Sequence, residues 1–341
     1  MSLETAWLAL LGLLLAGYFV LGGYDYGAQM LHPFLGGREE REAEPGGRDA
    51  ALEAIAPFFL GNEVWLVAFA GVLFGAFPHL EGTLLPGLYP LIVAIVAAVV
   101  LGNAAVQLRR RARGGRGRAV WDVLIVTGGA VPAVGWGLVV GLLLHGVPRR
   151  ADGSFHIGAG EVFAPFVLAC GAATVLLFAA HGAGFVALRS APGPAGRARR
   201  AGATLIAASG AAAAVALVLT LSGAGASMTN RAAAAAVAVV LAAAFGAAWW
   251  FLRAGHHARA FAATGVASAL PVALVGAGHY PYLLISSAGR GLDIEHAAAD
   301  DATLRILGVF GVLVVPTILA YQAWSWWAFR GRTGRRHTGY F

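Results

Sequence analysis

Nine long apolar stretches, separated by short polar segments, dominate the chain. They run over about residues 5–31, 51–77, 83–108, 119–144, 161–188, 201–222, 232–252, 258–280 and 303–329. Each is long enough to cross a hydrocarbon core of about 30 Å as an α-helix, which takes about 20 residues. The pattern predicts an all-α membrane protein with nine transmembrane helices and a single integral membrane domain over residues 1–341.

The short connections between these stretches indicate how the helices pack. Helices joined by short connections run antiparallel and side by side, so two four-helix bundles with a peripheral ninth helix are expected. Pro57 marks a candidate break in the second span, because proline leaves a backbone carbonyl without its helical partner. We expect 38–48 and 189–200 to be loops without regular structure, and 281–303 to form an ordered cap or a partner contact.

Charge is distributed unevenly between the two ends of the predicted spans. All 24 residues counted as lysine or arginine are arginines, and 19 of them lie in the connections 32–50, 109–118, 189–200 and 253–259 or in the tail 330–341. Arginines in short loops resist translocation, so this side is predicted to be cytoplasmic, with the N-terminus outside and the C-terminus inside. The net charge of +7 then suits the anionic inner leaflet, and no nucleic-acid partner is expected.

Several polar side chains fall within the predicted spans, where an ionisable group costs at least about 2.5–3.5 kcal/mol and therefore needs a partner or a function. In the first span, helical spacing places Tyr18, Gly22, Asp25 and Gln29 on one stripe. The next two spans contribute Glu53 near the cytoplasmic side, then Asn62 and Glu63 near the middle of the membrane, and Asn103 with Gln107.

Two interpretations of these groups fit their spacing equally well. In the first, these groups conduct protons from the cytoplasm into the membrane. The candidate residues of this proton pathway are Asp25, Glu63, Asn62, Glu53 and Gln107. In the second, the carboxyl groups and amides form hydrogen bonds between helices and fix the packing. Asp122, near the start of the fourth span, is expected to cap that helix, a position that the helix dipole favours.

The histidines and aromatic residues predict no cofactor site within this chain. Of ten histidines, only His181 lies well inside a span, and a haem with two axial histidines needs a facing pair. We therefore expect no haem or metal bound by this chain alone, and no catalytic residue on it. Trp65, Tyr321 and Trp324 are expected to make subunit or packing contacts.

Six segments, in order along the whole chain, resemble one family. They are Gly22–Leu31 (GGYDYGAQML), Ala54–Leu66 (AIAPFFLGNEVWL), His145–Pro148 (HGVP), His181–Ser190 (HGAGFVALRS), Tyr280–Ser287 (YPYLLISS) and Val314–Gly331 (VVPTILAYQAWSWWAFRG). The family is subunit II of the cytochrome bd-type quinol oxidases, including their cyanide-insensitive branch. GNEVWL and the final aromatic segment are the most specific matches.

The resemblance implies a role in a quinol:oxygen oxidoreductase of the bacterial cytoplasmic membrane. In that family, subunit I carries the b- and d-type haems, oxidises quinol and reduces O2 to water. Subunit II pairs with it without binding a catalytic haem and helps to bring in protons from the cytoplasm. The expected partners are therefore the haem-bearing subunit I, the lipid bilayer and, as a further candidate, a small accessory subunit.

The chain departs from the family pattern at several usual carboxylate positions. Gly22 and Leu60 stand where the family has acidic residues, and Gly102 and Gln107 stand where it has an arginine and an acid. Ile285 also replaces a common proline. Asp25 and Glu63 remain, so the resemblance implies a divergent member. Its proton route uses water beside these two groups, runs through subunit I, or is absent.

Two other functions stay open on the sequence alone. A membrane transporter or channel is one, although such transporters typically show repeated halves and interrupted helices, and no repeat is visible here. The other is a degenerate structural or assembly subunit that keeps the fold, because a fold does not guarantee its function. The neutral residues at the usual carboxylate positions favour this second alternative.

Overall fold

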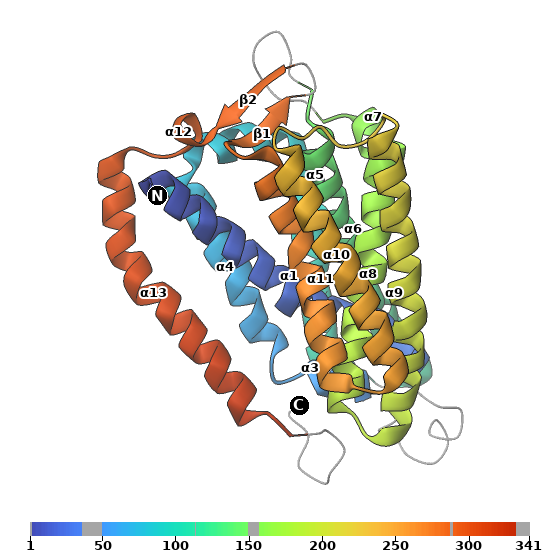
Figure 1. The fold of residues 1–341 in the computed structure, drawn as a ribbon. Coiled ribbons are helices and arrows are strands. Elements are labelled where there is room, and N and C mark those ends of the chain that lie inside the picture. Colours follow the sequence, from blue (N-terminus) through green and yellow to red (C-terminus); the bar gives the residue numbers. More distant parts are fainter. Residues whose placement is uncertain (1, 36–49, 113, 149–156, 287–288, 332–341) are drawn as a thin grey trace.

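A computed structural model describes residues 2–35, 50–112, 114–148, 157–286 and 289–331. Within these residues, nine helices are long and apolar enough to cross a membrane, as the hydrophobic pattern predicts. They are α1 (Leu3–Leu35), α4 (Phe59–Ala76), α5 (Pro78–Leu108), α6 (Gly114–His145), α8 (Pro165–Arg189), α9 (Pro192–Leu221), α10 (Arg231–Ala254), α11 (His257–His279) and α13 (Asp301–Ala328). Successive members of this set run in opposite directions (Figure 1).

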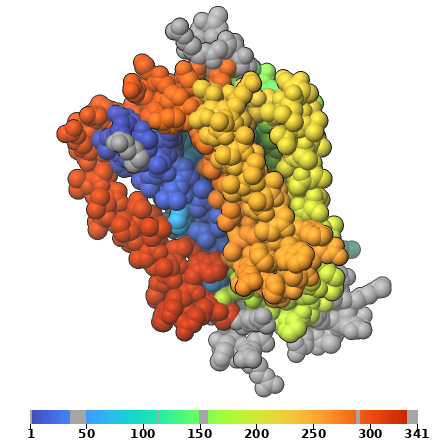
Figure 2. All heavy atoms as spheres, in the orientation of Figure 1, coloured from blue at the N-terminus to red at the C-terminus, as the bar shows by residue number. Residues whose placement is uncertain are grey.

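The helices form two four-membered bundles that share a core. Helices α1, α4, α5 and α6 contact one another around the first bundle, and α8, α9, α10 and α11 around the second. Contacts of α1 with α8 and α11, and of α6 with α8, join the bundles. Helix α13 packs mainly on α4, and Figures 1 and 2 show it along one side of the molecule. The predicted arrangement of two bundles and a peripheral ninth helix is confirmed.

Glycines bring the backbones of neighbouring helices together. Gly27 of α1 and Gly182 of α8 face each other, and a Cβ atom on either would overlap backbone atoms of the other helix. Gly102 of α5 and Gly128 of α6 make a similar contact. Because helices in lipid associate through close packing rather than through the hydrophobic effect, these contacts stabilise both the first bundle and its junction with the second.

Two predicted boundaries differ from the structure. The second predicted span is divided into α3 (Ala50–Ile55) and α4, with Pro57 in the turn between them. The prediction of a loop over 189–200 is wrong, because α9 already begins at Pro192. Proline suits the first turn of a helix, where its missing N–H would have no partner. The predicted loop 38–48 lies outside the described residues.

A small cap covers the end of the molecule at which α1 begins. Strands β1 (Tyr282–Ser286) and β2 (Gly289–Asp293) pair antiparallel, and α12 (Ile294–Ala297) follows. Leu284 and Ile294 are buried there in an apolar cluster with residues of α1, α4 and α5. The expected ordered cap is therefore present, although its strands were not predicted. Two further short helices are η1 (Arg109–Arg111) at the opposite end and α7 (Ala159–Val162) before α8.

The side chain of Asp300, which follows α12, fixes the start of α13. One carboxyl oxygen of Asp300 accepts hydrogen bonds from the backbone N–H groups of Ala302 and Thr303, both at 3.0 Å. The hydrogen bond from the Thr303 N–H contributes most to holding the pKa of Asp300 below its usual value. This N-terminal cap determines where the peripheral helix leaves the folded end of the molecule.

The contact between α1 and α8 generates a stability prediction. Gly182→Ala should destabilise the protein by about 1–3 kcal/mol, because backbone atoms of Gly27 and Ala28 occupy the space of the new methyl group and cannot rotate away. Thermal unfolding of the purified protein measures the effect. Gly210→Ala in α9 is the matched control, since no atom lies within 4 Å of its added methyl group. Equal stability of the two variants would contradict the proposed role of this contact.

Candidate functional site

A cluster of polar side chains lies between α1, α4 and α5. Asp25 precedes the end of α1 by ten residues and Asn103 precedes the end of α5 by five, while Asn62 and Glu63 are the fourth and fifth residues of α4. With a rise of 1.5 Å per residue, Asp25 and Asn103 are about 8–15 Å from the arginine-rich ends of their helices. Asn62 and Glu63 lie near the start of α4, and α3 continues beyond them toward the arginine-rich end.

Glu63 accepts hydrogen bonds on both carboxyl oxygens. The Tyr18 hydroxyl donates to Oε2 at 3.2 Å, and Nδ2 of Asn103 donates to Oε1 at 3.2 Å. The Tyr26 hydroxyl is hydrogen-bonded to that of Tyr18, and Nε2 of Gln29 donates to Oδ1 of Asn103 at 3.3 Å. A branch of hydroxyl and amide groups therefore extends from Glu63 into the first bundle.

Asp25 belongs to a second branch. Nδ2 of Asn62 donates to Oδ2 of Asp25 at 2.8 Å and to the Tyr24 hydroxyl at 2.7 Å. The Asp25 side chain is only 2% exposed, and its other oxygen, Oδ1, has no hydrogen-bond partner within the described part of the chain. Buried polar atoms are nearly always hydrogen-bonded, so this carboxyl oxygen is an exception that calls for a function.

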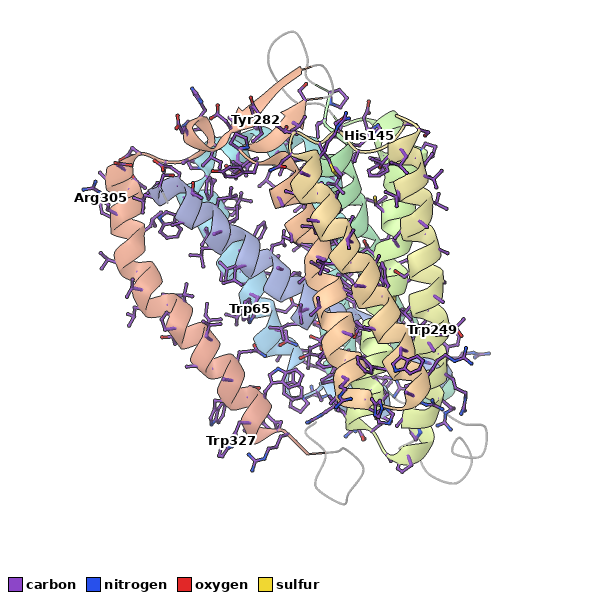
Figure 3. The ribbon with its side chains drawn as sticks, viewed as in Figure 1. Trp65, His145, Trp249, Tyr282, Arg305 and Trp327 are labelled. Carbon is purple, nitrogen blue, oxygen red and sulfur yellow. The ribbon has the colours of Figure 1, made fainter. Side chains whose placement is uncertain are left out.

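The peripheral helix reaches this second branch through Gln322. Nε1 of Trp65 donates to Oε1 of Gln322 at 3.2 Å, and Nε2 of Gln322 donates to Oδ1 of Asn62 at 3.3 Å. Because Oδ1 of Asn62 is engaged by Gln322, its NH2 group is directed at Asp25. Figure 3 shows Trp65 on the side of the bundle that faces α13. Gln322 was not among the predicted residues, although an amide within a span is a recognisable signal.

Glu63 also borders an open groove between α4 and α5. The groove has a volume of about 400 Å³ and is lined by Glu63, Leu66, Val67, Val96, Val99, Val100, Asn103, Ala104 and Gln107. Gln107 is exposed, and its Nε2 donates to the backbone carbonyl of Asn103 at 3.4 Å. The polar edge of the groove therefore leads from the end of α5 to the carboxyl group of Glu63.

Two other acidic residues lie apart from this cluster, near the arginine-rich end. Glu53 forms an ion pair with Arg110, with 3.0 Å between Nη2 and Oε1. Asp122 is paired with Arg109, and Nε2 of His32 is 3.6 Å from its carboxyl group. The prediction that Asp122 caps a helix is wrong, because α6 begins at Gly114, two turns earlier.

The remaining predicted contact residues differ in their surroundings. Trp65 is buried, and its ring fills the space beside Gly17 of α1. Tyr321 packs its hydroxyl group beside Gly61 of α4, whereas Trp324 is 56% exposed. Within this chain, Trp65 and Tyr321 therefore make packing contacts, and the exposed Trp324 ring contacts that of Tyr321, with centroids 6.2 Å apart.

Packing explains the two glycines, Gly22 and Gly102, that stand where the family pattern has an acidic residue and an arginine. The Tyr18 ring lies over Gly22, with atoms 3.0–3.3 Å from the position of a Cβ atom. At Gly102, a side chain would collide with the backbone of Gly128. The other two neutral positions, Leu60 on α4 and Gln107 on α5, are exposed. The site thus contains Asp25 and Glu63 as its carboxyl groups, with hydroxyl and amide groups around them.

His181 is not suited to ligate a haem. The ring is fully buried, with Nδ1 2.7 Å from the Thr264 hydroxyl and Nε2 3.0 Å from the carbonyl oxygen of Val20. It also stacks on Phe261 with ring centroids 4.7 Å apart. Binding iron would require one of these hydrogen bonds to break. In the described ranges, no group of three or more His, Cys, Asp and Glu side chains could hold a metal ion.

Comparison with known proteins gives consistent results along the chain. Residues 3–329 match the profile of a family described as "Cytochrome bd terminal oxidase subunit II". "Cytochrome bd ubiquinol oxidase subunit 2" of Bacillus subtilis (strain 168) is 28% identical over 337 residues, which cover 98% of both chains. "Cytochrome bd-I ubiquinol oxidase subunit 2" of Escherichia coli (strain K12) is 27% identical over 367 residues, covering 97% of this chain and 95% of the relative.

A solved structure has the same fold. It is the bd oxidase from Geobacillus thermodenitrificans, which matches with a TM-score of 0.75 and 18% sequence identity. The match covers 94% of this chain and 96% of the chain in that structure. The arrangement of helices described above is therefore shared with a chain of a bd oxidase.

The position of Gln322 generates a prediction for the Asp25 branch. Gln322→Leu should lower stability by about 1–3 kcal/mol, because Trp65 and Asn62 each lose a buried hydrogen-bond partner. It should also shift the infrared carboxyl-stretching band of Asp25, which is assigned by its loss in Asp25→Asn. Thr317→Val is the control on the same helix, since its hydroxyl group bonds only within α13. An unchanged Asp25 band in Gln322→Leu would rule out this positioning role.

Proposed function

Because the chain belongs to the cytochrome bd terminal oxidase subunit II family, we propose that it is the subunit that delivers cytoplasmic protons to the enzyme's oxygen-reducing centre. Family membership makes it a multi-pass membrane subunit of a bacterial respiratory quinol oxidase, and the transporter and channel alternatives fall away. The relatives are named for ubiquinol, so a quinol is the proposed electron donor of the complex. Haems of b and d type belong to the partner, subunit I, which oxidises quinol and reduces O2 to water.

The observation that carries this proposal is the position of Glu63 at the edge of an open groove. A proton-carrying group must be reached from water on one side and must be connected to further groups on the other. Glu63 borders the groove with Asn103 and Gln107, and through Tyr18 it is connected to the interior of the bundle. A purely structural carboxyl group would need the hydrogen bonds but not the access.

The direction of entry follows from the arginines. The end of α5 leads into η1, which consists of three consecutive arginines, and the side with 19 arginines is proposed to be cytoplasmic. Gln107 lies next to this end, Asn103 lies one turn further in on α5, and Asn103 is hydrogen-bonded to Glu63. Protons from the cytoplasm therefore enter beside Gln107, and the N-terminus of the chain is on the outer side.

The chemistry of the cluster suits proton transfer over short steps. The carboxyl group of Glu63 and the hydroxyl groups of Tyr18 and Tyr26 can each bind and release a proton, whereas Asn62 and Asn103 orient their neighbours. Asp25 Oδ1 can take up a proton without first losing a hydrogen bond. The two carboxyl groups and the tyrosines thus replace the carboxylates missing at Gly22 and Leu60.

The groove also indicates where the partner subunit lies. Glu63, Asn103 and Gln107 border the groove among valines, and polar groups of this kind are costly when they face lipid. A partner that covers α4, α5 and α13 would shield them and would receive the proton from Glu63. Large apolar side chains are exposed along this surface, among them Val67, Phe74, Val96, Leu313 and Trp324.

Substitution of the carboxyl groups tests the proton route. In the assembled oxidase, Glu63→Gln and Asp25→Asn should each slow oxygen reduction by at least about tenfold, because an amide cannot carry a proton. The haem content of the complex should stay unchanged. Glu295→Gln on the exposed helix α12 serves as the control and should keep full activity. Normal turnover in Glu63→Gln would remove this residue from the route and favour a degenerate structural subunit.

Purification tests the partner. Isolation of the complex through a tag on this chain should yield a stoichiometric second subunit, and the reduced-minus-oxidised spectrum should contain b- and d-type haem bands. When the partner has been removed, the spectrum of this chain alone should lack these haem bands. The reason is that both ring nitrogens of His181 are engaged in hydrogen bonds. A colourless preparation without a partner would contradict the proposed role in an oxidase, whereas haem bands that stay with this chain alone would contradict the assignment of the haems to subunit I.

A further inference from the structure

The two bundles differ in how they accommodate the arginines at their common end. In the first bundle, Arg109 is paired with Asp122 and Arg110 with Glu53. The second bundle has no carboxylates of its own, because the sequence contains no Asp or Glu between Glu161 and Asp293. It nevertheless places six arginines near this end, namely Arg189, Arg197, Arg199, Arg200, Arg253 and Arg259. The second bundle therefore ends in a strongly cationic surface.

Three of these arginines surround the last turn of α10. Nη1 of Arg199, on α9, donates to the carbonyl oxygens of Leu252 at 3.2 Å and of Arg253 at 2.8 Å. The Arg253 guanidinium lies over the Trp249 ring, 5.0 Å from its centroid, and that of Arg259 lies 6.0 Å from the Phe251 centroid. Aromatic contacts of this kind position a guanidinium without using its N–H donors.

The donors of Arg253 and Arg259 remain accessible for a ligand. Both side chains are exposed, and neither forms a hydrogen bond or an ion pair with another residue in the described part of the chain. Each guanidinium has five N–H donors in a planar fork that matches the oxygens of a phosphate group. Arg199 adds positive charge but uses its Nη1 on the α10 carbonyls, so it closes one side of the site.

The position of these arginines indicates that the phosphate group they would bind belongs to a lipid. Trp249 and Trp250 lie in the same turn of α10, and tryptophan at the end of a transmembrane helix marks the level of the lipid headgroups. Figure 3 shows Trp249 at the same end of the molecule as Trp327, opposite Tyr282 and His145. Basic side chains between transmembrane helices at this level are suited to anionic headgroups.

From this charge pattern and geometry, we propose that Arg253 and Arg259, on two sides of the end of α10 and supported by Arg199, bind the phosphate headgroups of anionic phospholipids. The site lies on α9, α10 and α11, whereas the Glu63 groove lies between α4 and α5, so the two share no residue. It therefore stands whether or not protons pass through Glu63. Anionic lipids held there would offset part of the positive charge at the end of the second bundle.

Lipid retention by the complete oxidase complex tests this site. The complex is purified in detergent, supplied with phosphatidylglycerol or with phosphatidylcholine of the same acyl chains, and examined by native mass spectrometry. The unmodified complex should retain phosphatidylglycerol preferentially. Arg253→Gln/Arg259→Gln should bind it about 30-fold more weakly, because each arginine near an anionic surface contributes about 1 kcal/mol and 1.4 kcal/mol corresponds to a factor of ten.

The control removes the same charge from the opposite end of the molecule. Arg231→Gln/Arg305→Gln should retain phosphatidylglycerol as the unmodified complex does, since these arginines are at the start of α10 and α13. Raised salt should weaken retention in the unmodified complex, because exposed charges are screened over about 10 Å at 0.1 M ionic strength. Equal loss in both double variants, or equal retention of phosphatidylcholine, would overturn the site.

Two competing occupants are separated by further arms of the experiment. If inorganic phosphate at millimolar concentration displaced the lipid fully, the site would be one for free phosphate and the lipid assignment would be wrong. The second competitor is the acidic segment of the chain itself, at Glu39, Glu40, Glu42 and Glu44, which lies outside the described residues. These four residues are changed to Gln in the unmodified complex and in Arg253→Gln/Arg259→Gln. Increased lipid retention in the first but not in the second would show that the acidic segment competes for the same arginines, and would support the site.

Discussion

The close contact between α1 and α8 at Gly27 and Gly182 is the constraint on which the rest of the structure depends. It places α1 between the two bundles, so that one helix contributes both to the shared core and to the polar cluster. Gly27 belongs to the stretch that also contains Tyr24, Asp25 and Tyr26. A displacement of this helix by one methyl group would therefore change the hydrogen bonds of Asp25 as well as the packing.

The polar cluster combines two requirements that conflict in a membrane. Buried carboxyl groups need donors, and a proton-carrying group also needs a position that can exchange its proton. Glu63 meets the first requirement through Tyr18 and Asn103, and it meets the second through the groove. Asp25 is satisfied on one oxygen only. The amides of asparagine and glutamine position these carboxyl groups at a lower free-energy cost of burial than charged groups would, because they carry no charge that must be removed from water.

Sequence patterns predicted those features that depend on local spacing. The nine spans, the two bundles, the break at Pro57 and the shared stripe of Tyr18, Asp25 and Gln29 follow from hydrophobic runs and helical periodicity. The pairing of Asp122 with Arg109 did not follow, because it depends on where α6 begins. Gln322 could not be placed either, since its contact with Asn62 joins residues 260 positions apart. The helical start of α9 was missed because a proline was interpreted as a loop signal rather than as the first residue of a helix.

The peripheral position of α13 has a consequence for the synthesis of the protein. This helix is made after both bundles, and few of its side chains are buried by the rest of the described chain. Its Gln322 nevertheless completes the hydrogen bonds of Asn62, a residue made near the beginning of synthesis. A chain that stops before α13 therefore inserts both bundles but leaves Asn62 free to turn its oxygen toward Asp25. The hydrogen bonds around Asp25 are therefore completed only after α13 has been made, although Asp25 itself lies on the first helix.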